Sequence, residues 1–358
     1  MPIMKRIDIS LLFVVILLSF FGLLMIYEAS SFIAFRDFGD KYHYLKDQSL
    51  WILLGLSGLV FFSLFDYRKL YLFSLPFLIA AIILLSLVFV PGVGVLLHGA
   101  RRWIDAGPFF IQPSEFVKLA LTIYLAAWFS HKEKGRFFAF LLLLGLVIFL
   151  IMLQPDMGTA AIILLEAIVM YFLSGGNIIH FLFLLPAIAA GGFFLIKIEP
   201  YRFERFIAFL SLGKSLEGSS YHVKQILIAL GMGGLTGVGF GNSLQKYAYL
   251  PENTTDSIFA IIAEEVGFLG STLVIICFMI LAARGFFIAF HSRTMFGKLL
   301  ASGITAFLSA QALINLGAQT ALVPLTGVPL PFISYGGSAL IVDLCSIGIL
   351  LNISKERV

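Results

Sequence analysis

The sequence predicts an all-α integral membrane protein with about ten transmembrane helices. Of its 358 residues, 60% are hydrophobic and only 12% are charged, and the mean hydropathy is +1.02. Apolar stretches of roughly 17 to 25 residues, long enough to cross a bilayer, recur along the chain, and no extended hydrophilic segment could form a separate globular domain. We therefore expect one polytopic membrane domain over residues 1–358. The expected spans are 9–31, 49–66, 71–90, 114–130, 137–153, 158–174, 180–197, 257–283, 298–323 and 332–352.

Loop charges predict the orientation of these spans. An even number of spans places both termini on one side, and basic residues recur in the loops of that side, which the positive-inside rule makes cytoplasmic. The basic residues are Lys5, Arg6, Arg68, Lys69, Lys132, Lys134, Arg136, Arg284, Arg293, Lys298, Lys355 and Arg357. The outer loops are then 32–48, 91–113, 154–157, 198–256 and 324–331. They hold the glycines, prolines and polar residues, so we expect the chemistry to be extracytoplasmic.

The segment from Tyr249 to Gly270, YLPENTTDSIFAIIAEEVGFLG, concentrates the ionisable residues. Asp256 lies in the first turn of an apolar helix, where free N–H groups and the helix dipole favour an anion, so it could be only a stabilising charge. Glu264 and Glu265 lie on the order of 12 Å deeper, at about 1.5 Å per residue. Acids at membrane depth are costly and indicate a functional site with a partner. Asp256 is therefore the leading catalytic candidate, supported by Glu264 and Glu265.

Basic residues also occur in the segment 99–118, GARRWIDAGPFFIQPSEFVK. The paired guanidinium groups of Arg101 and Arg102 suit a phosphate, because their planar donors match phosphate oxygens. A salt bridge with Asp105, or contact with lipid headgroups, would explain them equally well.

Glu115 and Lys118 are three residues apart and lie on one face of the fourth span. They either neutralise each other, or Lys118 reaches Glu264 or Glu265 across a cavity.

Three further segments belong to the outer side. The hairpin QPDMGT, which contains Asp156, reads as a tight turn on spacing alone. Arg202 and Arg205, in YRFERF, suit an interfacial helix with a basic and aromatic rim. The glycine-rich run 231–241 matches no nucleotide-binding pattern and predicts a close-approach or mobile backbone segment.

The stretch PLTGVPLPFISYGGS, which contains Ser334 and Gly336, interrupts a helix at membrane depth. Irregular backbone is tolerated there only when it is buried in protein or lines a watery cavity. We therefore expect a cavity wall near Asp256, and note that Gln311 and Asn315 are polar residues on one face of the ninth span.

Taken in order on ten spans, these motifs resemble the SEDS family of shape, elongation, division and sporulation proteins. The resemblance covers nearly the whole chain, and the compact length with short termini is more like the elongation branch than the division branch. It implies a peptidoglycan glycosyltransferase that polymerises lipid II on the outer face of the cytoplasmic membrane. It also implies a nascent glycan product, a class B penicillin-binding protein as transpeptidase partner and other membrane proteins of the elongation complex; nothing indicates nucleic acid.

Such a reaction needs a base for the acceptor hydroxyl and cations for the departing lipid pyrophosphate. Asp256 is the expected base, and a single carboxylate fits inverting transfer. Alternatively, Asp256 holds a divalent cation, Mg²⁺ or Mn²⁺, on the pyrophosphate; no organic cofactor is implied. A lipid II flippase is the rival function, because intramembrane charges and an outer cavity also suit a transporter. The pyrophosphate candidates are Arg101, Arg102, Lys118, Arg202 and Arg205.

Overall fold

The computed structural model of the protein describes residues 7–97, 99–107, 109–131, 135–211, 218–247 and 249–356. Of the basic residues used to predict the orientation, Lys5, Arg6, Lys132, Lys134 and Arg357 lie outside this part of the chain.

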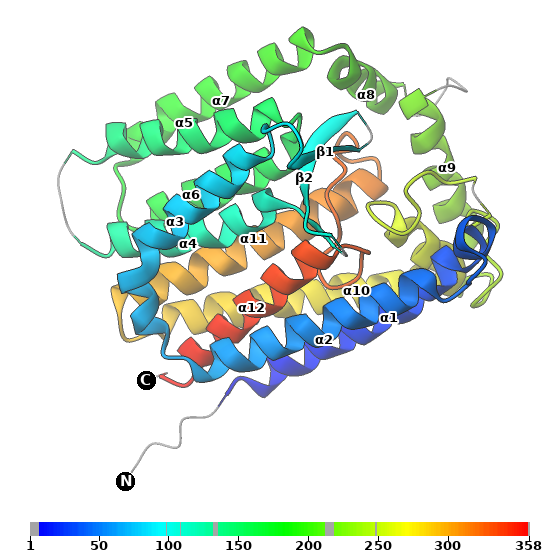
Figure 1. The fold of residues 1–358 in the computed structure, drawn as a ribbon, viewed down its shortest axis with the longest axis horizontal. Coiled ribbons are helices and arrows are strands. Elements are labelled where there is room, and N and C mark those ends of the chain that lie inside the picture. The colour runs from blue at the N-terminus through cyan, green and yellow to red at the C-terminus, as the bar shows by residue number, and fades with distance from the viewer. Residues whose placement is uncertain are drawn as a thin grey trace.

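Each of the ten expected spans corresponds to a helix of the bundle (Figure 1). In the described part of the chain, seven of these helices are both long and apolar enough to cross a membrane. The other three, α4, α5 and α6, have 17 residues each. The prediction of an all-α membrane protein is therefore confirmed. The ten helices are α1 (Ile9–Phe38), α2 (His43–Leu64), α3 (Leu70–Leu87), α4 (Pro113–Phe129), α5 (Phe137–Leu153), α6 (Met157–Leu173), α7 (Ile178–Ile198), α10 (Ile258–Phe290), α11 (Met295–Gln319) and α12 (Gly337–Ser354).

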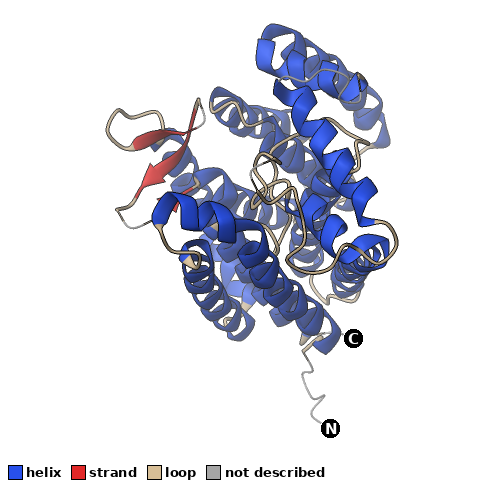
Figure 2. Cartoon of the chain, turned by 90° about the vertical axis from the view of Figure 1, so that its right-hand side faces the viewer, coloured by secondary structure: helices blue, strands red, loops and turns tan. Residues whose placement is uncertain are grey.

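Two segments expected as outer loops contain regular structure, of which the sequence predicted only a helix at YRFERF. Helices α8 (Pro200–Leu210) and α9 (Gly218–Gly233) precede α10. Residues between α3 and α4 form a three-stranded antiparallel sheet in the order β1 (Gly94–Leu97), β2 (Ala100–Asp105) and β3 (Phe110–Ile111). Viewed from the end that carries α8 and α9, the sheet lies at one edge of the bundle (Figure 2). This sheet was not predicted, because strands of two to six residues carry little periodic signal.

Helices α11 and α12 form the centre of the bundle, and α7 lies at its periphery. Of the most apolar 18-residue stretch of each helix, 78% is buried in α11 and 72% in α12, but only 6% in α7. Small residues allow the close packing around α11: a Cβ on Gly303 would lie 2.6 Å from side-chain atoms of both Met170 and Thr122. The bundle is therefore organised around its C-terminal helices.

The two ends of the described chain lie together, at the opposite end of the bundle from α8 and α9 (Figure 1). Asp8 forms an ion pair with Arg284 at 2.6 Å, and its backbone N–H donates to Ser354 Oγ at 3.1 Å. Arg68 pairs with Glu356 at 2.9 Å. The predicted inner-side residues Arg68 and Arg284 are thus at the end that carries both termini.

Candidate active site

Asp256 lies in the turn directly before α10, and side chains of α11 hold its backbone. Asn315 Nδ2 donates to the Asp256 carbonyl at 2.9 Å, and Gln319 Nε2 donates to the same oxygen at 2.6 Å. Asn315 also donates to the carbonyl of Val328, at 2.7 Å. The polar face of α11 therefore joins the Asp256 turn to the loop between α11 and α12.

That loop holds the two residues before Asp256. Ser334 Oγ donates to the Thr255 carbonyl at 2.6 Å, and the backbone N–H of Tyr335 donates to the Thr254 carbonyl at 2.9 Å. Ser334 Oγ in turn accepts the N–H of Leu330 at 2.8 Å. The irregular PLTGVPLPFISYGGS segment is therefore joined to the turn that carries the candidate base.

The Asp256 carboxyl group faces Arg205 of α8 across Gly327. A Cβ on Gly327 would lie 3.9 Å from both Asp256 Oδ2 and Arg205 Nη1. The same Arg205 nitrogen donates to the Leu325 carbonyl at 3.1 Å, and Thr255 Oγ1 donates to Asp256 Oδ1 at 3.2 Å. An acid and a guanidinium group thus converge where Gly327 leaves the space between them open.

Burial, and secondly the nearby Glu252, raise the pKa of Asp256 to about 6, although Arg205 acts in the opposite direction. A position next to the start of a helix lowers the pKa of a carboxyl group, whereas burial raises it. The structure favours burial. A carboxyl group whose pKa is near neutrality is a better proton acceptor for catalysis than an ordinary aspartate.

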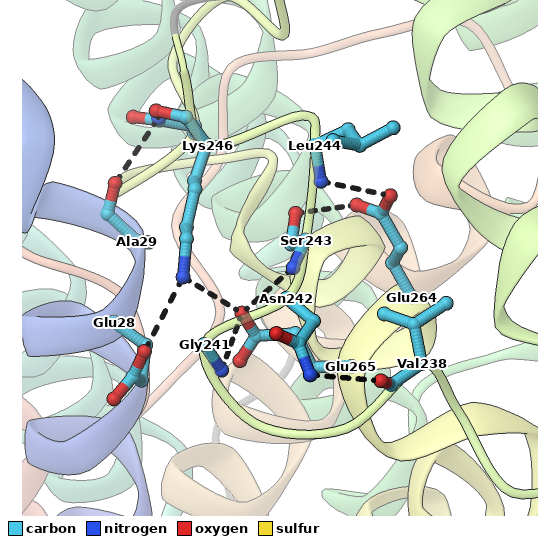
Figure 3. Close-up of polar contacts among 11 residues, drawn as sticks. Glu28, Ala29, Val238, Gly241, Asn242, Ser243, Leu244, Lys246, Glu264 and Glu265 are labelled. Carbon is cyan, nitrogen blue, oxygen red and sulfur yellow. Dashed lines mark hydrogen bonds and ion pairs between the residues drawn. The ribbon is translucent and has the colours of Figure 1, made fainter.

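The two deeper acids of α10 bind the loop that follows α9 (Figure 3). Glu264 accepts the backbone N–H of Leu244 at 3.2 Å and also the hydroxyl of Ser243. Glu265 accepts Lys246 Nζ at 3.3 Å. These contacts are the partners that acids at membrane depth require, and they hold the outer segment against the helix.

Helix α10 is broken at Gly267, where φ is 69° and ψ is −168°. The glycine-rich segment supplies the backbone bonds that the break removes: Val238 N–H donates to the Glu264 carbonyl at 3.0 Å, and the Gly234 carbonyl accepts Phe268 N–H at 2.9 Å. The expected close approach of this segment is confirmed. Its partner is a helix backbone.

Lys118 does not contact the acids of α10, so the prediction that it reaches Glu264 or Glu265 is wrong. Its ammonium group pairs with Glu115 at 2.7 Å and donates to Gln311 Oε1 at 2.6 Å, and all three residues are buried. Gln311 Nε2 then donates to the Pro329 carbonyl at 3.1 Å. The alternative prediction, that Glu115 and Lys118 neutralise each other, is what the structure shows.

Arg102 and Asp156 both stabilise the hairpin between α5 and α6. Arg102 Nε donates to the Gln154 carbonyl at 2.9 Å, and a second guanidinium nitrogen donates to the Pro155 carbonyl. Asp156 caps α6, accepting the N–H of the third helical residue at 3.1 Å. Arg101, by contrast, is exposed on β2.

Arg202 and Arg205 do not form one rim. Arg202 is buried and donates to the Leu195 carbonyl of α7 at 3.3 Å, whereas Arg205 faces Asp256. Gly336 lies directly before α12, where its N–H donates to Gln48 Oε1 at 3.4 Å.

Several residues of this region were not predicted from the sequence. Lys246 lies between two acids, 3.4 Å from Glu28 of α1 and 3.3 Å from Glu265. His222 of α9 lies next to the Asp256 turn, 2.7 Å from Ser257 Oγ. One signal was available for Gln319: it follows Asn315 and Gln311 at intervals of four, which places all three on one helix face.

A protein-held metal centre is not indicated by the described residues, where no group of three or more His, Cys, Asp or Glu side chains could hold an ion. One cavity, of about 340 Å³, lies at the ends of α3 and α4 remote from the sheet; it is not at Asp256. It is lined by Tyr71, Ser74, Tyr124, Ala127, Trp128 and His131.

Fold and site together define a polytopic helical membrane protein whose partly buried acid–base groups gather at one end of the bundle. Residues 8–358 match the family of cell cycle proteins that comprises FtsW, RodA and SpoVE. The chain belongs to this family, so the resemblance to SEDS proteins is confirmed.

Individual relatives match over almost their whole length. Stage V sporulation protein E of Bacillus subtilis is 41% identical over 355 residues, which covers 97% of each chain. A probable peptidoglycan glycosyltransferase FtsW of Geobacter sp. (strain M18) is 38% identical over 355 residues, 98% of this chain and 97% of that one.

Solved structures agree with these matches. A chain of a peptidoglycan synthase complex, described as coordinating polymerization and crosslinking, is similar with a TM-score of 0.82 and 29% identity, covering 98% of both chains. The rod shape determining protein RodA of Thermus thermophilus is similar with a TM-score of 0.73 and 29% identity over 98% of both chains.

Proposed function

We propose that this protein is a peptidoglycan glycosyltransferase that polymerises lipid II into glycan strands. The observation that carries the proposal is the Asp256 turn: α11 and the loop before α12 fix its backbone, while the carboxyl group faces Arg205 with a pKa of about 6. The curated relatives named peptidoglycan glycosyltransferase support the same activity.

In the proposed reaction Asp256 takes the proton of the acceptor sugar hydroxyl as that oxygen attacks the anomeric carbon of the donor. The new C–O bond forms as the bond to the lipid pyrophosphate breaks, and the pyrophosphate leaves with the electron pair. Configuration inverts, because no second carboxylate acts as a nucleophile. Proton transfer by a positioned group of suitable pKa contributes typically about 10²–10⁴-fold to rate.

Arg205 is the leading candidate to stabilise the pyrophosphate, with Arg101 second because its side chain is exposed at the same end of the bundle. Arg205 also donates to the Leu325 carbonyl, but it ranks first because it acts on the Asp256 carboxyl group. Of the other proposed cations, Lys118 binds Glu115 and Gln311, and Arg102 binds the hairpin carbonyls. Arg202, buried against α7, donates to a carbonyl there. We assign these three to holding the site in shape.

The residues present fit a divalent cation only if the substrate supplies most of its ligands. Mg²⁺ is commonly held by one or two carboxylates together with substrate phosphates, and Asp256 with the nearby Glu252 could provide the carboxylates. Bound Mg²⁺ or Mn²⁺ would neutralise charge on the leaving pyrophosphate.

We also propose where the protein lies in the cell. We propose a multi-pass protein of the cytoplasmic membrane with both termini inside and Asp256 outside. Its partners would be a class B penicillin-binding protein that supplies the transpeptidase and membrane proteins of the elongation complex. The peptidoglycan synthase complex among the similar structures supports such a partner.

Cell elongation is the most specific part of the proposal, and the similar structures of the rod shape determining protein RodA support it. Curated relatives carry FtsW and sporulation names instead. Depleting the protein in its host separates the branches: loss of rod shape supports elongation, whereas filamentation or a block in sporulation would replace it with division or sporulation.

The activity is tested with the purified full-length chain and its penicillin-binding partner in liposomes that contain fluorescent lipid II. The partner carries no glycosyltransferase activity of its own. Glycan ladders on a gel are the expected result. If wild-type protein moves labelled lipid II across the bilayer without making ladders, the polymerase proposal is wrong and the flippase alternative takes its place.

A further inference from the structure

His222 lies where α9 meets the turn that carries the candidate base. Its Nε2 is 2.7 Å from the hydroxyl of Ser257, the residue that follows Asp256. Ser257 is fully buried and His222 is partly buried. The proposed mechanism assigns no role to either residue.

Ser257 occupies the N-cap position of α10 but does not act as a side-chain cap. A serine at this position usually accepts a backbone N–H from the first turn of its own helix. Here the Ser257 side chain makes no such bond, and its hydroxyl interacts with the imidazole of α9 instead. The bond joins two helices rather than stabilising one.

The other bonds described above reach the turn from other elements. The carbonyls of residues 254, 255 and 256 accept donors from α11 and from the loop before α12. His222 adds a contact from α9, which itself packs on α10. The position of the turn therefore depends on α9 as well as on α11 and the loop before α12.

Arg205 links His222 to the acid electrostatically. Burial, with Arg205 as the second cause, lowers the pKa of His222 to about 4, so the imidazole is neutral at neutral pH. A neutral ring has one donor and one acceptor nitrogen and can bond a hydroxyl without adding a second positive charge beside Arg205. In the described part of the chain, Arg205 shifts the pKa values of both His222 and Asp256, and Glu252 shifts that of Asp256.

We propose that His222 is a positioning residue: through Ser257 it holds the turn against α9 and so fixes the Asp256 carboxylate relative to Arg205. This inference rests on the proposed glycosyltransferase function. A displacement of about 1 Å at a reacting group can cost on the order of 10²-fold in rate, so one bond next to the base can matter although it does not touch the substrate.

The test compares His222→Ala, His222→Gln, Ser257→Ala and the His222→Ala/Ser257→Ala double variant. The full-length chain is used with its partner in lipid II liposomes. A glutamine can still bond the Ser257 hydroxyl, so it separates the bond from the ring. The matched control is Ile228→Ala, because Ile228 is exposed on the same helix. Two readouts are taken: kcat and KM for glycan synthesis, and hydrogen exchange of the backbone amides of residues 254–260.

Each alanine substitution should lower kcat about tenfold, the loss of one neutral hydrogen bond at the site, with KM little changed. The double variant should be no slower than either single one. Exchange at 254–260 should rise in the alanine variants, while His222→Gln should keep both readouts near wild type.

Wild-type rates in His222→Ala would overturn the inference. A loss of about 100-fold in the double variant, the product of two independent tenfold losses, would also overturn it. Unchanged exchange at 254–260 in the alanine variants would also overturn it. If wild-type protein makes no glycan but the alanine variants still raise exchange there, the glycosyltransferase proposal fails and the structural part of the inference stands.

Discussion

Three acids in the turn before α10 and in the first half of α10 are treated by the structure in two opposite ways. At Asp256, neighbouring elements bind the backbone carbonyl, and the carboxyl group faces Arg205. At Glu264 and Glu265, the carboxylates themselves are bonded to the outer loop. These acids lie fewer than ten residues apart and yet differ in role. Asp256 is held so that its carboxylate can react, whereas Glu264 and Glu265 use their carboxylates for folding.

The sharpest test of this comparison is Asp256→Asn, which should lower glycan synthesis at least 100-fold, because an amide cannot accept the acceptor's proton. Thermal stability should not fall, since the turn is held through backbone carbonyls that the substitution leaves in place. Ladder formation and the melting temperature are measured together. Asp105→Asn is the control, because Asp105 is an exposed acid of the outer sheet; glycan synthesis by Asp256→Asn at the rate of this control would rule out Asp256 as the base.

Glu265→Gln should act on stability instead. Removing one partner of a buried ion pair costs about 3–5 kcal/mol, and we expect about 2 kcal/mol here because Lys246 keeps its contact with Glu28. The free energy of unfolding is compared with that of Asp37→Asn, which removes an exposed pair with Arg36 and should leave stability almost unchanged. Equal stability of the two variants would contradict a folding role for Glu265.

A substitution in the glycine-rich segment tests the backbone contact between this segment and α10. A Cβ on Gly237 would lie 2.1 Å from the Glu265 carbonyl oxygen, and φ there is +82°. Gly237→Ala should therefore destabilise the protein by about 1–3 kcal/mol. Gly231→Ala is the control: nothing lies within 4 Å of its Cβ position in α9, so it should be neutral or slightly stabilising. A melting temperature of Gly237→Ala that matches the control would show that the two backbones separate easily.

The last expected effects come from the raised pKa of Asp256 and depend on pH. Activity should fall as pH drops through about 6, because protonated Asp256 is no base. For stability the sign is opposite: folded protein binds more protons than unfolded protein between pH 3.8 and about 6, so stability falls as pH rises through that window. Asp256→Asn should remove this dependence and raise stability at pH 8 by on the order of 2 kcal/mol. A variant with the same stability profile as wild type would contradict the raised pKa.

Hydropathy located all ten helices, with ends that differ from the observed ones by up to seven residues, because it measures transfer into lipid, the same property that fixes where these helices form. The i, i+3 spacing of Glu115 and Lys118 likewise identified a pair that the structure contains. Both features are local, and local patterns can be read from one chain.

What the sequence did not reveal depends on distant segments. Nothing in the run before α10 indicated that Lys246 would bind Glu265, because the contact exists only once the loop folds back on the helix. The break at Gly267 was also hidden, since glycine is common in transmembrane helices. Arg202 and Arg205 shared a predicted face, but packing against α7 separated them.

The two acids that precede the break at Gly267 also bear on how the chain enters the membrane during synthesis. A charged side chain at the bilayer centre costs about 3 kcal/mol on insertion scales, so the first half of α10 would be a poor stop-transfer segment alone. Residues 238–246 leave the ribosome before α10, and they bind Glu264 and Glu265 in the folded protein. The partners of Glu264 and Glu265 are therefore synthesised before the acids that they bind in the folded protein.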